Sequence, residues 1–356
     1  MLAHRTQIKN EPNCLISGLL NKRATTYPRL CLALRNLILN EVSMDAHKDF
    51  KRLPEIISEL KRQLNFYPVD RKIVYDKVAG ADAGSQRVPL ASRWFAVITA
   101  LIYQLPNARR YFTNPEAIKL PYCFSSEKFH EIVSVRRETK LFETSASFLT
   151  KNDGLDLMLI DGPLAFSNWW ARKGEERDRL ALISSVNFLL NLCAERGVAI
   201  AGVVKRTTAR YLIRYLGLQE KTFLPDAFVL LQTLKAGERT NIFSPKSALR
   251  RTMRAAPFMD LIDSHIYSFY MRTSSNRLLP PIRIDIPEFM LSHVDELAGY
   301  CYSTAVRDGI PLPIVKADEE VKVTKKFVNE VYSELIPRLE RRFGSSLAAA
   351  IRGGLG

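Results

Sequence analysis

The segment Leu155–Leu164, LDLMLIDGPL, contains the clearest strand pattern in the chain. Its apolar run ends at Asp161, where a glycine and a proline follow and stop a strand. A helix is predicted from about Glu175 to Arg196, and Gly197 stands where a helix-ending glycine is favoured. Val198–Val204 is a second apolar strand. The order strand, helix, strand predicts a crossover unit with a parallel pair of strands.

The segments on either side extend this α/β pattern. Arg93–Gln104 is apolar and rich in β-branched and aromatic residues, which predicts a buried strand. Two glycines in Gly80–Ser85 predict a turn or bulge before it. Ile282–Ile286 alternates, which predicts an antiparallel or edge strand with its apolar side chains inward and its charged side chains outward.

Helices are expected at both ends of the chain. Leucines at three- and four-residue steps predict helices within residues 1–70. A last amphipathic helix is predicted over Lys325–Phe343, kinked or split at Pro337. We therefore expect an α/β fold with helical additions at both termini. Its expected parts are a helical region, 1–70, a core, 71–325, and a C-terminal helix and tail, 326–356.

The overall charge indicates a polyanionic partner. The 356 residues include 52 basic and 37 acidic side chains, a formal charge of +15. Such a field attracts nucleic acid first and an anionic membrane second, and the alternative is a merely basic soluble protein. The longest apolar run, Trp94–Tyr103, has about half of the roughly 20 residues that a membrane helix needs. We expect a cytoplasmic protein without a membrane partner.

Two aspartates stand at the ends of apolar β segments, each near glycine. They are Asp82 and Asp161. Ligands bind where the strands of open α/β sheets end, and carboxylates from separate strands can converge there on Mg²⁺ or Mn²⁺. A metal pair would then activate water against a phosphodiester. The alternative is that both aspartates form turns, which the neighbouring glycines also favour.

A series of short motifs follows the same order as those of a known family. The series is Gly80–Ser85 followed by Arg93–Tyr103, Leu157–Leu164, Gly202–Lys205, Arg283–Pro287, and Gly309–Pro313 with Ala317-Asp318. Together these motifs resemble those of the NurA nuclease family across roughly residues 75–325. The motif that ends in Asp161-Gly162-Pro163-Leu164 is the strongest of them.

This resemblance implies a fold and an activity. The family has an RNase H-like mixed-sheet core, forms homodimers and uses Mn²⁺, or Mg²⁺ in its place. Its members digest single- and double-stranded DNA, with 5′ to 3′ exonuclease and single-strand endonuclease action. They work with the hexameric HerA ATPase in DNA end resection and repair, and related pairs act in defence.

The resemblance also implies a set of site residues. Asp82 and Asp161 take the places of two metal-binding aspartates, and Glu143 fits the family's helix glutamate, with Glu138 as the alternative. Lys205, which ends an apolar strand, would neutralise charge on a phosphate or else lie in solvent. Asp318 stands where the family often has histidine and would be a further catalytic residue or metal ligand.

Two departures from the family's pattern bear on activity. Ile310 replaces a tyrosine and cannot donate a side-chain hydrogen bond, and Ala83 is inserted between Asp82 and the next glycine. The leading hypothesis is a metal-dependent nuclease with Asp82, Glu143 and Asp161 as ligands. The alternative is a non-catalytic DNA-binding or scaffold subunit of such a complex.

Basic and aromatic side chains are candidates for contacts to DNA. Arginines could track the phosphate backbone or form ordinary solvated faces. Trp169 and Trp170 follow the Asp161 motif, and they either stack on bases or pack against the core. The candidate arginines are Arg206, Arg210, Arg250, Arg251 and Arg254.

Overall fold

The computed structural model describes residues 28–88, 93–121, 123–252 and 257–345. The chain divides into two compact units, residues 1–54 and 55–356. The described part of the first unit consists of helix α2 (Pro28–Lys51) and the start of α3 (Leu53–Gln63). The predicted helical region 1–70 therefore extends across the boundary between the units, and its division from the core at residue 70 stays an interpretation.

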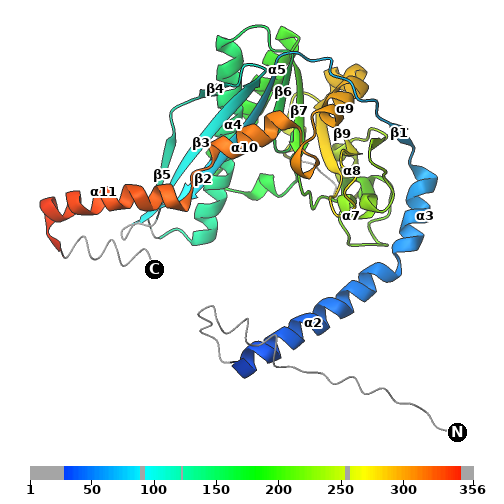
Figure 1. Ribbon diagram of the computed structural model, residues 1–356, viewed down its shortest axis with the longest axis horizontal. Coiled ribbons are helices and arrows are strands. Elements are labelled where there is room, and N and C mark those ends of the chain that lie inside the picture. The colour runs from blue at the N-terminus through cyan, green and yellow to red at the C-terminus, as the bar shows by residue number, and fades with distance from the viewer. Residues whose placement is uncertain (1–27, 89–92, 122, 253–256, 346–356) are drawn as a thin grey trace. The chain divides into compact units, whose positions relative to one another are not determined.

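The second unit contains the sheet and the helices that cover it (Figure 1). None of the described helices has both the length and the apolar character needed to cross a membrane. The strands are β1 (Phe66–Pro68), β2 (Val78–Arg87), β3 (Arg93–Leu105), β4 (Arg109–Phe112), β5 (Glu116–Pro121), β6 (Leu157–Asp161), β7 (Ala199–Val204), β8 (Glu238–Thr240), β9 (Ile266–Arg272) and β10 (Ile282–Pro287). The helices are α4 (Ser126–Lys151), α5 (Glu176–Arg196), α6 (Tyr211–Tyr215), α7 (Asp226–Leu231), α8 (Pro245–Thr252), α9 (Val294–Ser303), α10 (Leu312–Val321) and α11 (Lys325–Phe343), with 3₁₀ turns η1 (Trp170–Arg172), η2 (Met259–Leu261), η3 (Glu288–His293) and η4 (Arg307–Gly309).

One mixed sheet of ten strands organises this unit. Its order is β1-β8-β9-β10-β7-β6-β2-β3-β4, and β5 also pairs with β3. The central pairs β2–β6 and β6–β7 are parallel, whereas the flanking pairs are antiparallel. An antiparallel β2–β3–β4 meander followed by parallel β6 and β7, with α4 and α5 as the connecting helices, is an RNase H-like arrangement. The predicted α/β fold class is confirmed.

The predicted crossover unit is present. Helix α5 connects β6 to β7, which pair in parallel with Ile160 opposite Gly202. Gly197 follows α5 with φ 65° in the left-handed region, as a helix-ending glycine does. Both strands are almost wholly buried, which explains their continuous apolar sequence.

Helices cover both faces of the sheet. Strand β3 shows the two faces, since successive side chains point to opposite sides. Ile98 packs in a cluster with Phe129 of α4, whereas the neighbouring Thr99 donates its hydroxyl to the carbonyl of Val321 in α10. In Figure 1, α10 crosses in front of β2 and β3, and α4 and α5 lie behind the sheet.

The predicted turn at Gly80–Ser85 is wrong, because these residues lie inside β2. Their glycines serve a close approach between elements instead. A Cβ atom on Gly80 would overlap the backbone of Pro313, and one on Gly84 would lie 2.7 Å from the carbonyl oxygen of Val321. The two glycines let α10 lie directly on the strand.

Strand β10 is antiparallel to both of its neighbours, as one alternative predicted, but its surroundings differ from the prediction. It lies between β9 and β7 rather than at an edge, and its charged residues Arg283 and Asp285 are buried. Both faces of β10 are therefore buried, and the alternation in its sequence separates an apolar face from a charged face. The last helix, α11, has the predicted bounds and continues past Pro337, so it is not split there.

The close contact between α10 and β2 gives a stability prediction. Replacing Gly80 by alanine puts a methyl group into the backbone of Pro313, so α10 must move. We expect Gly80→Ala to lower the free energy of unfolding by about 3 kcal/mol, measured by denaturant titration. Ser85→Ala, on the same strand and half-buried, is the control. Equal stability of Gly80→Ala and the wild type would contradict this packing.

Candidate metal centre and adjoining pocket

Three carboxylates from three elements converge beside the C-terminal end of β6. They belong to Asp82 of β2, Asp161 of β6 and Asp318 of α10, and one oxygen of each lies within 4.8 Å of the others. The parallel register pairs Ala81 with Ile160, so Asp82 and Asp161 are the next residues of two adjacent strands. The helix that rests on Gly80 and Gly84 brings Asp318 to the same place.

Lys205 completes this group. It follows the last residue of β7, and its Nζ lies 2.5 Å from Oδ2 of Asp161 and 3.8 Å from Oδ1 of Asp318. Asp318 also accepts a 2.6 Å hydrogen bond from Lys322, one helical turn further on. The two lysines offset only part of the negative charge that the three aspartates bring together.

Burial makes this cluster electrostatically unfavourable. Burial and then the charge of Asp161 raise the pKa of Asp82 to about 8, although its hydrogen bond from the Ala83 amide acts against this. Burial raises the pKa of Asp161 to about 6, against the opposing effect of Lys205. Burial also acts to raise the pKa of Asp318, but the hydrogen bond from Lys322 and the charge of Lys205 outweigh it and hold that pKa below its ordinary value.

The donor set fits a divalent cation. Hard ions such as Mn²⁺ and Mg²⁺ are held by carboxylate oxygens, and all three candidate ligands are aspartates. A cation at this position would relieve the repulsion that raises the pKa values of Asp82 and Asp161.

The structure does not bring Glu143 to these aspartates. It lines a groove between α4 and α5 together with Phe188. Glu138, five residues earlier and so about 140° away around the helix, faces the cluster instead. Its Oε2 lies 3.6 Å from where a Cβ of Gly162 would be, and its charge contributes to the raised pKa of Asp161. Helical periodicity alone does not indicate which glutamate faces the sheet.

A buried ion pair fixes the loop that follows Asp161. The carboxylate of Asp285 accepts hydrogen bonds from Arg283 Nε at 2.8 Å and from Ser268 Oγ at 2.6 Å. It also accepts from the backbone amides of Leu164 at 3.2 Å and Ala165 at 3.1 Å. This role was not predicted from the sequence, although an arginine and an aspartate two residues apart on a strand point to the same face.

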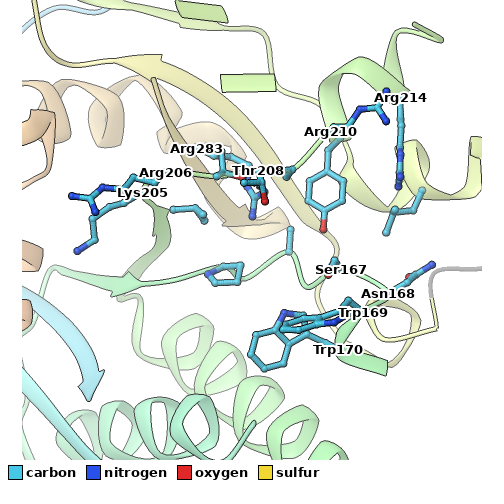
Figure 2. A pocket seen from close by; sticks show the side chains of 17 residues that line it. Ser167, Asn168, Trp169, Trp170, Lys205, Arg206, Thr208, Arg210, Arg214 and Arg283 are labelled. Atoms are coloured by element: carbon cyan, nitrogen blue, oxygen red, sulfur yellow. Dashed lines mark hydrogen bonds between the residues drawn. The ribbon is translucent and has the colours of Figure 1, made fainter. Parts of the chain in front are cut away.

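A basic pocket of about 550 Å³ adjoins the metal centre (Figure 2). Lys205 lines it and also contacts Asp161, so the pocket and the acidic cluster share a wall. Loops after β6 and β7 form the pocket, and its lining includes Trp169, Trp170 and Arg214. The sequence pointed to both tryptophans, and to Arg214 as one of the basic residues that follow the Val198–Val204 strand.

The candidate arginines have different surroundings. Arg206 and Arg210 line the pocket. Arg250 bonds to Asp260 at 2.7 Å, and Arg251 donates to the carbonyl of Tyr215. Arg254 lies outside the described residues. Arg206 and Arg210 are therefore the two of this set that the structure places beside the metal centre.

The fold and the site define an RNase H-like protein with an acidic centre suited to divalent cations. The family model of the NurA domain matches residues 69–323. Because this match covers more than half of the chain, the protein belongs to the NurA domain family.

Solved structures support the same fold. The NurA nuclease from Sulfolobus solfataricus is 17% identical, with a TM-score of 0.63, over 89% of this chain and 99% of that chain. A NurA structure bound to dAMP and manganese is 12% identical, with a TM-score of 0.52, over 88% of this chain and 98% of that chain. Comparison with the curated proteins gave no significant match.

The crowded carboxylates predict a stability effect that depends on pH. Because the folded-state pKa of Asp82 is raised, ionisation of this carboxyl lowers the stability of the metal-free protein progressively as the pH rises from about 4 to about 8. Asp82→Asn removes this charge and keeps a carbonyl oxygen for the Ala83 amide. At pH 8 in EDTA we expect it to be about 2 kcal/mol more stable than the wild type, a few degrees in melting temperature.

Thermal unfolding at pH 5 and pH 8 measures this effect. The difference should shrink at pH 5, where the wild-type carboxyl is largely protonated. Asp153→Asn, a change at a carboxylate that is 96% exposed, is the matched control. A destabilised Asp82→Asn protein at both pH values would show that the charge of Asp82 does not oppose folding.

Proposed function

We propose that this protein is a divalent-metal-dependent deoxyribonuclease. The observation that carries the proposal is the convergence of Asp82 inside β2, Asp161 at the end of β6 and Asp318 of α10 within 4.8 Å. Membership of the NurA domain family supports it, and so does the relative that was solved with dAMP and manganese. Mn²⁺, or Mg²⁺ in its place, is the proposed cofactor.

The aspartates and Lys205 would have separate roles in phosphodiester hydrolysis. A divalent ion held by the three aspartates supplies the charge that activates water and stabilises the leaving oxygen. Lys205, already held beside Asp161, would pair with a non-bridging phosphate oxygen. The +15 chain would attract DNA to this centre.

Glu138 is the proposed fourth carboxylate, in the role that the family resemblance assigns to a helix glutamate. It is buried, and its Oε1 accepts a 2.5 Å hydrogen bond from Arg137. Burial of Glu138 beside Gly162 supports this assignment over Glu143. Ile310 packs in the apolar core, so no tyrosine hydroxyl acts from that position.

The finer activities and partners follow from the family resemblance. We propose 5′ to 3′ exonuclease and single-strand endonuclease action in the cytoplasm, in repair or defence. The proposed partners are a HerA-type hexameric ATPase and a second copy of this chain. Helix α2 supports a docking role, since it exposes a set of apolar side chains: Leu30, Leu32, Leu34, Leu37, Ile38, Leu39 and Val42.

Cleavage of end-labelled DNA in Mn²⁺ tests the activity. We expect the wild type to cleave and Asp161→Asn to lose at least about 100-fold in rate, because it removes a charged ligand between two others. Asp153→Asn, outside the cluster, should cleave at the wild-type rate. Metal-independent DNA binding without cleavage by the wild type would favour the non-catalytic scaffold instead.

The two glutamates of α4 give a paired test. Glu138→Gln should weaken Mn²⁺ binding and slow cleavage by about 10- to 100-fold, because it removes a charge next to Asp161. Glu143→Gln, on another face of the same helix, should leave both unchanged. Calorimetric titration with Mn²⁺ and measured cleavage rates compare the two variants. A larger loss in Glu143→Gln than in Glu138→Gln would assign the role to Glu143.

A further inference from the structure

Two loops enclose the pocket beside the metal centre. One follows β6 and carries Trp169 and Trp170, and the other follows β7 and carries Arg206 and Arg210. Figure 2 shows the tryptophans on one side of the pocket and the side chains of Arg210 and Arg214 on the other. The pocket therefore has an aromatic wall and a cationic wall that face each other.

The aromatic wall combines a fixed ring and an open ring. Trp170 packs edge-on against buried Phe166, with their ring centroids 5.4 Å apart. Trp169 stands edge-on against Trp170, with Lys173 over its ring, yet it stays 57% exposed. Trp169 is thus held in place by its neighbours while a large part of its surface remains open for stacking.

Carboxylates of the chain neutralise little of the positive charge in the cationic wall. None of the described residues that line the pocket is acidic. Arg206 is highly exposed, with Asp308 at 3.9 Å. Arg214 has no carboxylate within ion-pair distance among the described residues. Two arginines are exceptions. Asp285 neutralises Arg283, and Arg210 donates to the carbonyls of Gln219 and Thr222. Arg206 and Arg214 are therefore placed to bind an anion that comes from outside the chain.

The position of the pocket indicates which anion. Lys205 contacts Asp161 and lines the pocket. A polyanion with one phosphate at the aspartates would therefore place its neighbouring units between the two walls of the pocket. Stacking on Trp169 needs a base whose face is free, which single strands offer and duplexes do not. A volume of about 550 Å³ is in the range of small-ligand sites, not of a double helix.

We propose that this pocket binds unpaired nucleotides of a single-stranded DNA segment next to the phosphate at the metal centre. A base stacks on Trp169, and the flanking phosphates pair with Arg206 and Arg214. The inference rests on the proposed function and adds a preference for single strands at this side of the site.

Binding measured without metal tests the pocket separately from cleavage. Fluorescein-labelled oligothymidylate and a matched duplex are titrated with full-length protein in EDTA, and anisotropy is recorded. We expect Trp169→Ala to weaken single-strand affinity about tenfold or more and duplex affinity less than about twofold, because duplex bases already stack on each other. Trp169→Phe should recover most of the loss.

Matched controls separate the pocket from general charge and exposure. Phe188→Ala removes an aromatic residue of nearly equal exposure, 58%, in the groove between α4 and α5. This change should leave binding unchanged. Arg206→Ala should reduce the salt dependence of binding by about one unit of slope. Arg177→Ala should leave the salt dependence unchanged, although Arg177, like Arg206, has a carboxylate 3.9 Å away.

Tryptophan fluorescence gives a direct readout of stacking. The chain has three tryptophans, so Trp94→Phe combined with Trp170→Phe leaves Trp169 as the reporter. We expect oligothymidylate to quench the fluorescence of Trp169. Binding without quenching, together with wild-type affinity of Trp169→Ala, would overturn the inference even if DNA is cleaved. Quenching in a protein that does not cleave would support the pocket and reject the nuclease proposal.

Discussion

The buried ion pair between Arg283 and Asp285 connects the parts of this site. Asp285 binds the backbone of Leu164 and Ala165, and so fixes the loop that begins at Asp161 and continues to the tryptophans. Removing one partner of such a pair costs about 3–5 kcal/mol, since the other charge stays buried alone. The metal centre and the pocket therefore depend on the same interaction, which lies in β10, where Arg283 also lines the pocket.

Local patterns predicted the centre of the fold. The segment β6–α5–β7 was predicted because its strands are buried on both faces and its helix ends at a glycine, and both signals lie within a few residues. Asp161 could be singled out because it ends a strand, whereas Asp82, predicted at a strand end as well, lies inside β2 and reaches the site through the register of β2 with β6. Gly80 and Gly84 were misinterpreted, since their role is the approach of α10, a contact that lies more than 200 residues away in the sequence and leaves no local pattern.

The remaining site residues show a second limit of sequence reasoning. Glu138 and Glu143 lie on one helix, and only the packing of α4 decides that Glu138 faces Gly162. The charged residues of β10 read as solvent-facing because burial of a charge is favourable only with its partners in place. Those partners, Ser268 and the amides after β6, come from other elements. Such roles depend on tertiary contacts, which periodicity does not encode.

The distribution of charge explains how a basic protein can keep an acidic centre. Arg250 and Arg251 are held by Asp260 and by the Tyr215 carbonyl, so they add little to an open cationic surface. The pocket lining, in contrast, has no acidic residue among those described, and Lys205 joins it directly to the aspartates. A phosphate backbone would thus meet positive charge up to the metal centre, where a bound cation continues that field. The raised pKa of Asp82 is the cost of this arrangement in the metal-free protein, and the cation that function requires is also what relieves it.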